Sequence, residues 1–191
     1  MVGNSLGGWV AVELAKIRPV RSLTLPSPAG LWRGDTPLYC MVSLRLSRWL
    51  AAHAGPALSR IVATRPGRAV VLGQMLDHPT RLPAAQARSA VQALGTCPGF
   101  DATLEATARR RIRGAQQVTA PVTVAFGSRD HVLLKHQLRH LGELPPTTRS
   151  AALPGCGHLP MSDDPARVTD VIITSTSRAS AAPAPPHPGR Q

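Results

Sequence analysis

The opening stretch of the chain, VGNSLGGW, constrains its fold more than any other segment. It contains the pattern G-x-S-x-G, in which a serine occupies a sharp turn between a strand and a helix. Because the chain packs tightly at such a turn, we expect that side chains at Gly3 and Gly7 would clash there. The pattern predicts that Ser5 is a nucleophile and that the Leu6 N–H donates to a developing oxyanion. The alternative is an ordinary helix start, capped by the asparagine or the serine.

Length and charge limit the classes of protein to which the chain can belong. Its 191 residues suffice for one domain with a hydrophobic core. The net charge of +12 suggests a nucleic-acid partner, but 20 of the 22 basic residues are arginines scattered along the chain. One cluster, residues 109–113, falls in a stretch with a helical pattern, where a solvated face is the common explanation. We therefore do not expect nucleic acid as a partner.

Cysteine usage and apolar runs bear on the compartment. Cys40, Cys97 and Cys156 are an odd number without C-x-x-C spacing, which favours neither a disulfide framework nor a zinc site. The sequence has no apolar run of about eighteen residues and no signal-peptide pattern. We expect a cytoplasmic protein with no membrane partner, no metal and no cofactor.

Strand and helix patterns predict an α/β core with an insertion. Residues 1–30 are expected to hold the elbow, a helix and a strand, and residues 115–174 the C-terminal part of the same core. Residues 31–114 show helical patterns separated by prolines and predict a helical cap. Residues 175–191, rich in Ser, Ala and Pro, predict a disordered tail. The expected helices cover 8–18, 37–53, 57–63, 69–76, 84–94, 101–112, 132–144 and 165–174, and the expected strands 20–25, 121–126 and 148–153.

Apolar side chains of the expected cap are candidates for the wall of a pocket. Packing of helix against helix is the competing explanation at each position. The candidates are Leu44, Leu46, Trp49, Leu50, Met75 and Leu76.

Two loops that follow successive predicted strands carry groups that suit a serine nucleophile. The sequence GSRD places Asp130 after one strand, and GCGH places His158 after the next. The carboxyl ends of parallel strands meet at one edge of a sheet, where reactive groups gather. His158 would accept the proton of Ser5, and Asp130 would fix the tautomer of His158. Taken singly, Asp130 is as well explained as a turn or N-cap residue and His158 as a structural histidine.

The chain order Ser5, Asp130, His158 is that of the α/β hydrolases. With the motifs GNSLGG, SPAG, GSRD and GCGH, the chain resembles this superfamily from residue 2 to about residue 174, and within it the cap-bearing serine hydrolases. The resemblance implies the C-terminal part of an α/β-hydrolase fold, with a parallel sheet, flanking helices and a helical cap. It implies a Ser-Asp-His triad acting on a small-molecule ester, thioester or related acyl substrate. A serine at the elbow disfavours the epoxide hydrolase and haloalkane dehalogenase reactions.

The chain departs from this family at its N-terminal end. Family members begin with several strands and helices, and an early loop supplies a second oxyanion donor, whereas Met1 lies four residues before Ser5. We expect about 80–100 residues, the N-terminal half of the sheet, to be missing, either through a start assigned too late or through real truncation. We expect the chain as written to fold poorly and to have little activity, because losing one oxyanion donor costs about 10²–10³ in rate. The alternative is a non-catalytic remnant or a basic interaction protein with residues 109–113 as its contact surface.

Three weaker candidates remain. His136 and His140 lie on one face of an expected helix but lack the glutamate and third ligand of a zinc site, so a solvated face is favoured. Cys156 lies near His158, in a glycine-rich turn where a structural role is expected. The pair Asp163 and Asp164, followed by a proline, is expected to cap the last helix.

Overall fold

A three-stranded parallel sheet forms the centre of the computed structural model, which describes residues 1–134 and 140–181. Its strands are β1 (Leu23–Pro26), β2 (Val122–Gly127) and β3 (Arg149–Leu153), in that order across the sheet. Leu25 of β1 pairs with Val124 of β2. Because all three strands run in the same direction, the loops that follow them share one edge of the sheet.

Residues 1–5, ahead of the elbow, lie along the outer edge of β1. Val2 forms an isolated parallel bridge with Thr24, and Ser5 forms another with Pro28. The elbow is therefore held beside β1 by short bridges rather than by a full strand.

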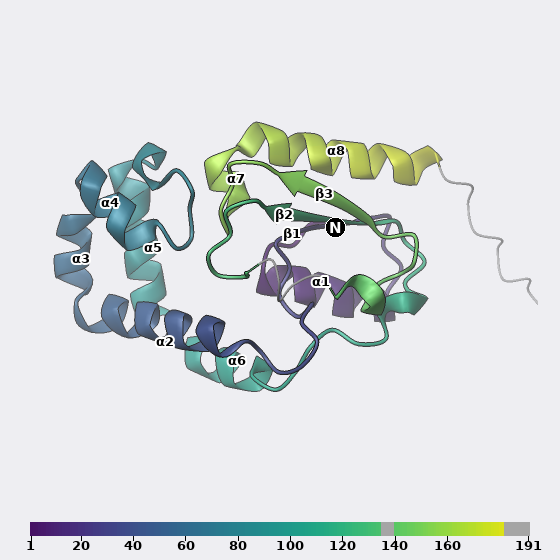
Figure 1. Ribbon diagram of the computed structural model, residues 1–191, viewed down its shortest axis with the longest axis horizontal. Helices are drawn as coiled ribbons and strands as arrows, with labels where there is room; N and C mark the ends of the chain where they lie inside the picture. Colours follow the sequence, from purple (N-terminus) through teal and green to yellow (C-terminus); the bar gives the residue numbers. More distant parts are fainter. Residues whose placement is uncertain (135–139, 182–191) are drawn as a thin grey trace, which may run out of the picture.

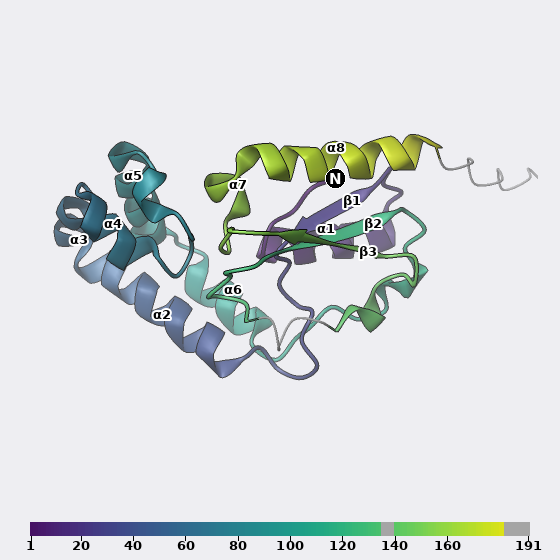
Figure 2. The ribbon, with the colours of Figure 1, turned by 45° about the horizontal axis from the view of Figure 1, so that its top comes forward.

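Helices cover both faces of the sheet. α1 (Leu6–Ile17) lies against one face and α8 (Pro165–Ala181) against the other, as Figures 1 and 2 show. On the α1 side, Trp9 and Val12 join the main cluster of buried apolar residues. On the α8 side, Val168 packs with a smaller buried cluster. This arrangement of helix, sheet and helix is the α/β core that the sequence predicts.

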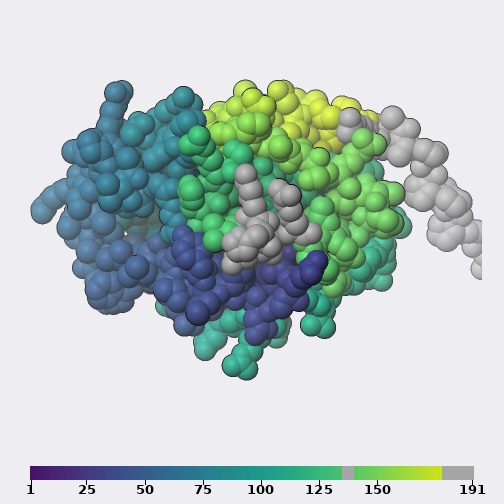
Figure 3. All heavy atoms as spheres, viewed as in Figure 1, coloured from purple at the N-terminus to yellow at the C-terminus, as the bar shows by residue number. Residues whose placement is uncertain are grey.

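A group of helices inserted between β1 and β2 stands at one end of the molecule (Figure 1). Its members are α2 (Leu38–His53), α3 (Gly55–Ile61), α4 (Arg65–Leu72), the 3₁₀ turn η1 (Pro79–Arg81), α5 (Ala84–Thr96) and α6 (Phe100–Thr107). Helices α2 to α5 enclose a hydrophobic cluster of their own, built on Ala51, Val62, Ala87 and Val91. In Figure 3 this group, in blue and teal, packs alongside the green and yellow residues of the C-terminal part. Among the described helices, none is long and apolar enough to cross a membrane.

The last helix is longer than the sequence predicts. Helix α8 runs to Ala181, whereas the expected helix stops at residue 174 and a disordered tail begins at 175. No proline follows Pro165 until Pro183, and Ser175 is buried with its hydroxyl donating to the Val171 carbonyl, so the helix continues. Residues 182–191 lie outside the described part of the chain.

The expectation of a helix over residues 132–144 is wrong at both of its described ends. Residues 132–133 form a bend, and Leu141–Glu143 form the 3₁₀ turn η3, while residues 135–139 lie outside the described residues. The bend follows because the Asp130 carboxylate accepts the N–H groups of Val132 and Leu133 and turns the chain back on itself.

The arginine cluster at residues 109–113 also differs from the expected helical face. Helix α6 ends at Thr107, and the cluster continues without regular secondary structure up to the 3₁₀ turn η2 (Ala115–Gln117). Ile112 is fully buried and its N–H donates to the Gly30 carbonyl at 2.9 Å. Burying this one apolar residue in the core pulls the segment out of helical conformation.

Candidate active site

The backbone at Ser5 is strained, as the turn predicts. Its φ of 52° and ψ of −122° fall in a region that non-glycine residues rarely adopt, and α1 begins at the next residue. The turn is held by hydrogen bonds to the loop after β1, because the Ser5 N–H donates to the carbonyls of Pro26 and Ser27. In return, the Ser5 carbonyl accepts the Ala29 N–H at 2.9 Å. The Ser5 side chain makes no capping hydrogen bond to α1, so its hydroxyl is available for another partner.

Close packing at the elbow requires two glycines, and one of them is not the residue that the sequence pattern indicates. A Cβ atom on Gly3 would lie 2.2 Å from the Gly7 carbonyl oxygen. A Cβ atom on Gly8 would lie 2.8 Å from the Pro28 Cβ atom, whereas one on Gly7 would meet nothing within 4 Å. The expectation that Gly7 avoids a clash is therefore wrong, and Gly8 has that role because it faces the loop after β1.

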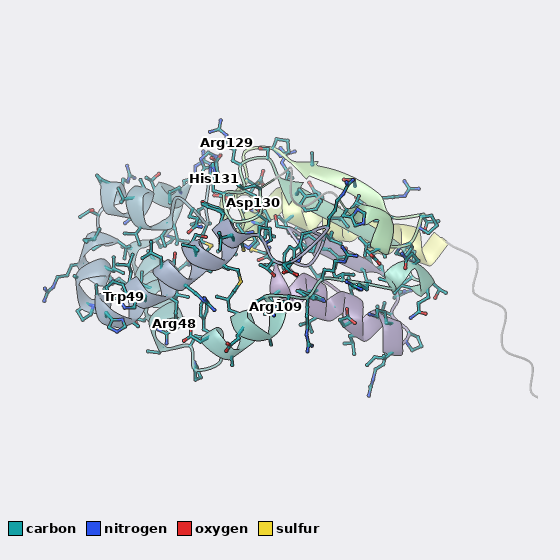
Figure 4. The ribbon with its side chains drawn as sticks, turned by 60° about the horizontal axis from the view of Figure 1, so that its bottom comes forward. Arg48, Trp49, Arg109, Arg129, Asp130 and His131 are labelled. Atoms are coloured by element: carbon teal, nitrogen blue, oxygen red, sulfur yellow. The ribbon has the colours of Figure 1, made fainter. Side chains whose placement is uncertain are left out.

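The structure brings the side chains of Ser5, Asp130 and His158 together. The Ser5 Oγ lies 2.9 Å from the His158 Nε2, and the His158 Nδ1 lies 2.9 Å from the Asp130 Oδ2. An ionised carboxylate can only accept hydrogen bonds, so Nδ1 donates to Asp130 and Nε2 is left to accept from the serine hydroxyl. Asp130 follows β2 and His158 follows β3, at the shared edge of the sheet. Figure 4 shows Asp130 beside Arg129 and His131, on the part of the molecule away from Trp49.

Asp130 is buried and kept ionised by its hydrogen bonds. Its other oxygen accepts the N–H groups of Val132 and Leu133 at 2.9 and 2.8 Å. Burial alone would raise the pKa of Asp130, but the hydrogen bond and charge of His158 and the two backbone hydrogen bonds together hold that pKa below its ordinary value of 3.8.

Asn4 links the elbow to the histidine loop, which sequence reasoning missed. Its Nδ2 donates to the carbonyls of Pro26 and His158, both at 3.0 Å. The sequence offered Asn4 only as a helix cap, because the partner loop lies 154 positions along the chain. Asn4 thus fixes where the backbone of His158 lies relative to Ser5.

Asp163 holds the same histidine loop from the other side. This buried carboxylate accepts the Gly157 N–H at 2.8 Å and, from the helical insertion, the N–H groups of Asp77 and His78 at 3.1 and 2.8 Å. The expectation that Asp163 caps the last helix is wrong, because only Asp164 does so, accepting the Arg167 N–H at 3.0 Å. The sequence does contain a signal for this second role: two aspartates are adjacent, and a helix cap needs only one of them.

Leu6 occupies the first helical position of α1, directly after Ser5. The first N–H groups of a helix have no intrahelical carbonyl to bind, so the Leu6 N–H needs a partner outside α1. Its role as an oxyanion donor stays a prediction.

A cavity of about 910 Å³ lies next to the histidine loop, within the helical insertion. Leu159 and Ser162 border it on the core side, and the rest of the wall comes from α2 to α5 and from the segments that join α4, η1 and α5. The described residues that line it carry no charge. Of the six expected pocket residues, Leu46, Leu50, Met75 and Leu76 contribute to its wall. Leu44 and Trp49 do not; Leu44 packs against the main hydrophobic core.

The weaker candidates gain no support as sites from the described residues. His136 lies outside the described residues, and the N–H of His140 donates to the Leu31 carbonyl. Among residues 1–134 and 140–181, no three His, Cys, Asp or Glu side chains cluster as metal ligands. Burial, assisted by nearby carboxylates, raises the pKa of the Cys156 thiol to about 11, which disfavours a thiolate nucleophile there.

Comparison with known proteins identifies the family. The model of the alpha/beta hydrolase family matches residues 1–171. This chain belongs to that family. An epoxide hydrolase of Mycobacterium tuberculosis, EphH, is 28% identical over 182 residues, which cover 91% of this chain and 84% of that protein.

Solved structures of the same fold are more distant in sequence. A crystal structure of a membrane phospholipase A, described as a bacterial virulence factor, matches with a TM-score of 0.69 and 20% identity, over 95% of this chain and 57% of its own. A meta-cleavage product hydrolase from Pseudomonas fluorescens matches with a TM-score of 0.63 and 16% identity, over 93% of this chain and 64% of its own. At these identities the similarity shows the fold alone. The chain spans 57% of the length of the first of these structures and 64% of the length of the second.

Proposed function

We propose that this α/β hydrolase is a cofactor-free serine hydrolase of esters, thioesters or related small acyl compounds. The observation that carries the proposal is the continuous hydrogen-bonded series from Asp130 through His158 to Ser5, with both bonds at 2.9 Å. A serine hydroxyl is a weak nucleophile until a neighbouring base accepts its proton, and this series supplies the base and its orienting carboxylate.

In the proposed reaction, the Nε2 of His158 takes the proton of the Ser5 hydroxyl as Oγ attacks the acyl carbon. The Leu6 N–H stabilises the oxyanion, and the protonated His158 then gives its proton to the leaving group. Water, deprotonated by the same nitrogen, attacks the acyl-enzyme ester. The C–O bond to Ser5 then breaks, His158 returns the proton to Oγ, and the acid is released. Asp130 stabilises the imidazolium formed in both half-reactions.

The uncharged cavity beside Leu159 supports an aliphatic acyl group as the substrate portion bound by the insertion. Its volume of about 910 Å³ lies within the range of small-molecule pockets. Burying an apolar chain there is favourable, whereas a carboxylate would lose its hydration without gaining a cation.

All three cysteines are free thiols, which supports the proposed cytoplasmic location.

Similarity to an epoxide hydrolase makes epoxide opening the second reaction to test. Ser5 argues against it on chemical grounds. Serine attack on an epoxide would give an ether, which has no carbonyl for water to attack, whereas a carboxylate nucleophile would give a hydrolysable ester. We expect no turnover of styrene oxide.

A fluorophosphonate probe tests the proposal directly, because it reports activation of Ser5 without requiring full turnover. We expect the full chain to be labelled at Ser5, with Ser5→Ala unlabelled and Asp130→Asn labelled much more slowly. Ser59→Ala, a serine in α3 distant from the site, is the matched control and should label as the unmodified chain does. Absence of labelling in a folded chain, or labelling that survives Ser5→Ala, would overturn the proposal.

A further inference from the structure

Helix α2 presents a stripe of large apolar side chains to solvent. The stripe consists of Leu38, Val42, Leu46 and Trp49, which are 77%, 55%, 54% and 56% exposed. Their spacing of three and four residues places them along one side of the helix. Figure 4 shows Trp49 on the helical group, away from Asp130. A soluble surface rarely carries so many large apolar residues in one row.

The helical group around this stripe carries an excess of positive charge. Between residues 38 and 96 the sequence has seven arginines and one acidic residue, Asp77. Within the described residues none of these seven arginines forms an ion pair, and Asp77 is paired with Arg129 and His78 instead. Arg45, which is exposed, lies between Val42 and Trp49 on the same side of α2. Arg68 is buried and Arg48 donates to the Gly95 carbonyl, so they do not add to the surface charge. The exposed arginines of the helical group are Arg45, Arg60, Arg65, Arg81 and Arg88. An apolar row on a helix group with exposed arginines is the pattern of helices that lie in a membrane interface.

The stripe also borders the cavity. Leu46 belongs both to the stripe and to the cavity wall. Other wall residues are exposed as well, among them Tyr39, Ile61 and Val70 at 46%, 45% and 83%. Leu46 therefore joins the stripe to the wall of the cavity.

We propose that the α2 stripe docks the protein on an anionic lipid surface, with α2 lying in the plane of the headgroups. Charge complementarity selects this partner over a second copy of the chain, because two copies would bring their unpaired arginines together. It also selects lipid over nucleic acid, whose phosphates would leave the apolar row exposed to water. The sequence expectation of no membrane partner rested on the missing span, and a surface-bound helix needs none. Docking does not depend on catalysis, so the two proposals fail independently.

Trp49 provides a built-in probe for the test. The other two tryptophans, Trp9 and Trp32, are 8% and 4% exposed and pack edge to face against each other at 5.8 Å. A change in tryptophan emission on adding vesicles therefore reports on Trp49. We expect a blue shift with vesicles of phosphatidylcholine containing about one third phosphatidylglycerol, no shift with phosphatidylcholine alone, and weaker binding as salt is raised.

Matched variants of the full chain separate docking from general stickiness. Leu38→Glu with Val42→Glu should weaken vesicle sedimentation more than tenfold, and Arg45→Gln about fivefold. Val10→Glu with Ile17→Glu changes residues of α1 that are 58% and 76% exposed, and should bind as the unmodified chain does. All are surface positions, so thermal melting should be unchanged.

Three results would overturn the proposal. Equal loss of binding in the α1 pair would show that any exposed apolar residue suffices. Sizing chromatography in which Leu38→Glu with Val42→Glu converts a dimer to a monomer, without vesicle binding by either form, would make the stripe a self-association surface. A Trp49 shift produced by double-stranded DNA and not by anionic vesicles would assign the arginines to nucleic acid.

Discussion

Replacing Asp163 by asparagine tests whether the histidine loop depends on this carboxylate. Its Oδ2 accepts two N–H groups, from Gly157 and Asp77, and its Oδ1 accepts that of His78. Asparagine has one carbonyl oxygen, so whichever way the amide turns, at least one buried N–H faces an NH₂ group. One unsatisfied buried donor costs about 1–3 kcal/mol, and the lost charge weakens the remaining bonds, giving about 2–4 kcal/mol in all.

For a chain of this length each kcal/mol lowers the melting temperature by about 2–4 °C, so Asp163→Asn should melt about 4–16 °C lower. With the amide oxygen at the Oδ2 position, the Gly157 N–H keeps an acceptor but loses the charge that strengthens the bond, one residue before His158. Fluorophosphonate labelling of Ser5 should therefore slow about tenfold or more at a temperature where the variant is folded.

Asp164→Asn is the matched control, because Asp164 is exposed and caps α8 through the Arg167 N–H, a role in which asparagine serves equally well. It should melt and label as the unmodified chain does. If Asp163→Asn matched the control in both measurements, the carboxylate would not be holding the loop. Rescue of labelling by Asp163→Glu, which restores two accepting oxygens, would distinguish loss of positioning from a general loss of packing.

Three further predictions follow from geometry and charge. The pKa of Asp130 is lowered on folding, so its contribution to stability is present above about pH 4 and is lost as the pH falls through the folded pKa. In urea unfolding from pH 5 to pH 2, the free energy of unfolding should therefore fall less steeply for Asp130→Asn than for the unmodified chain. Gly3→Ala should prevent stable folding because its Cβ atom would lie 2.2 Å from a backbone oxygen, while Gly7→Ala should melt within a few degrees of the unmodified chain by circular dichroism. Because burial raises the pKa of Cys156 to about 11, iodoacetamide at pH 8 should modify the partly exposed Cys97 first. Mass spectrometry of the folded chain measures both rates, and an equal rate at Cys156 would refute this expectation.

Structural features that depend on a few adjacent residues were predictable from the sequence. The elbow around Ser5, and the loops that bring Asp130 and His158 to one edge, depend on local turns after strands that the apolar pattern marks. The expected helix 37–53 lies within a residue of α2 at each end, because prolines and the helical pattern delimit it.

Features that depend on distant partners were not predictable. The donors to Asp163 lie 6, 85 and 86 positions away, so its spacing to the next helix suggested a cap instead. Ile112 leaves helical conformation because it fills the core beneath Gly30, a contact that the helical pattern of residues 101–112 does not reveal. The outward row on α2 was likewise hidden, because the sequence alone does not say which side of a cap helix faces the core.

The hydrogen bond between Ser5 and His158 joins residues that are synthesised at different times, because 153 positions separate them. At about 5–20 residues per second, the serine leaves the decoding centre some 8–30 seconds before the base that activates it has been made. During that interval the Ser5 hydroxyl has no base to accept its proton. Its reactivity begins only when the segment after β3 has docked beside the elbow, so the nascent chain is protected from premature acylation until then.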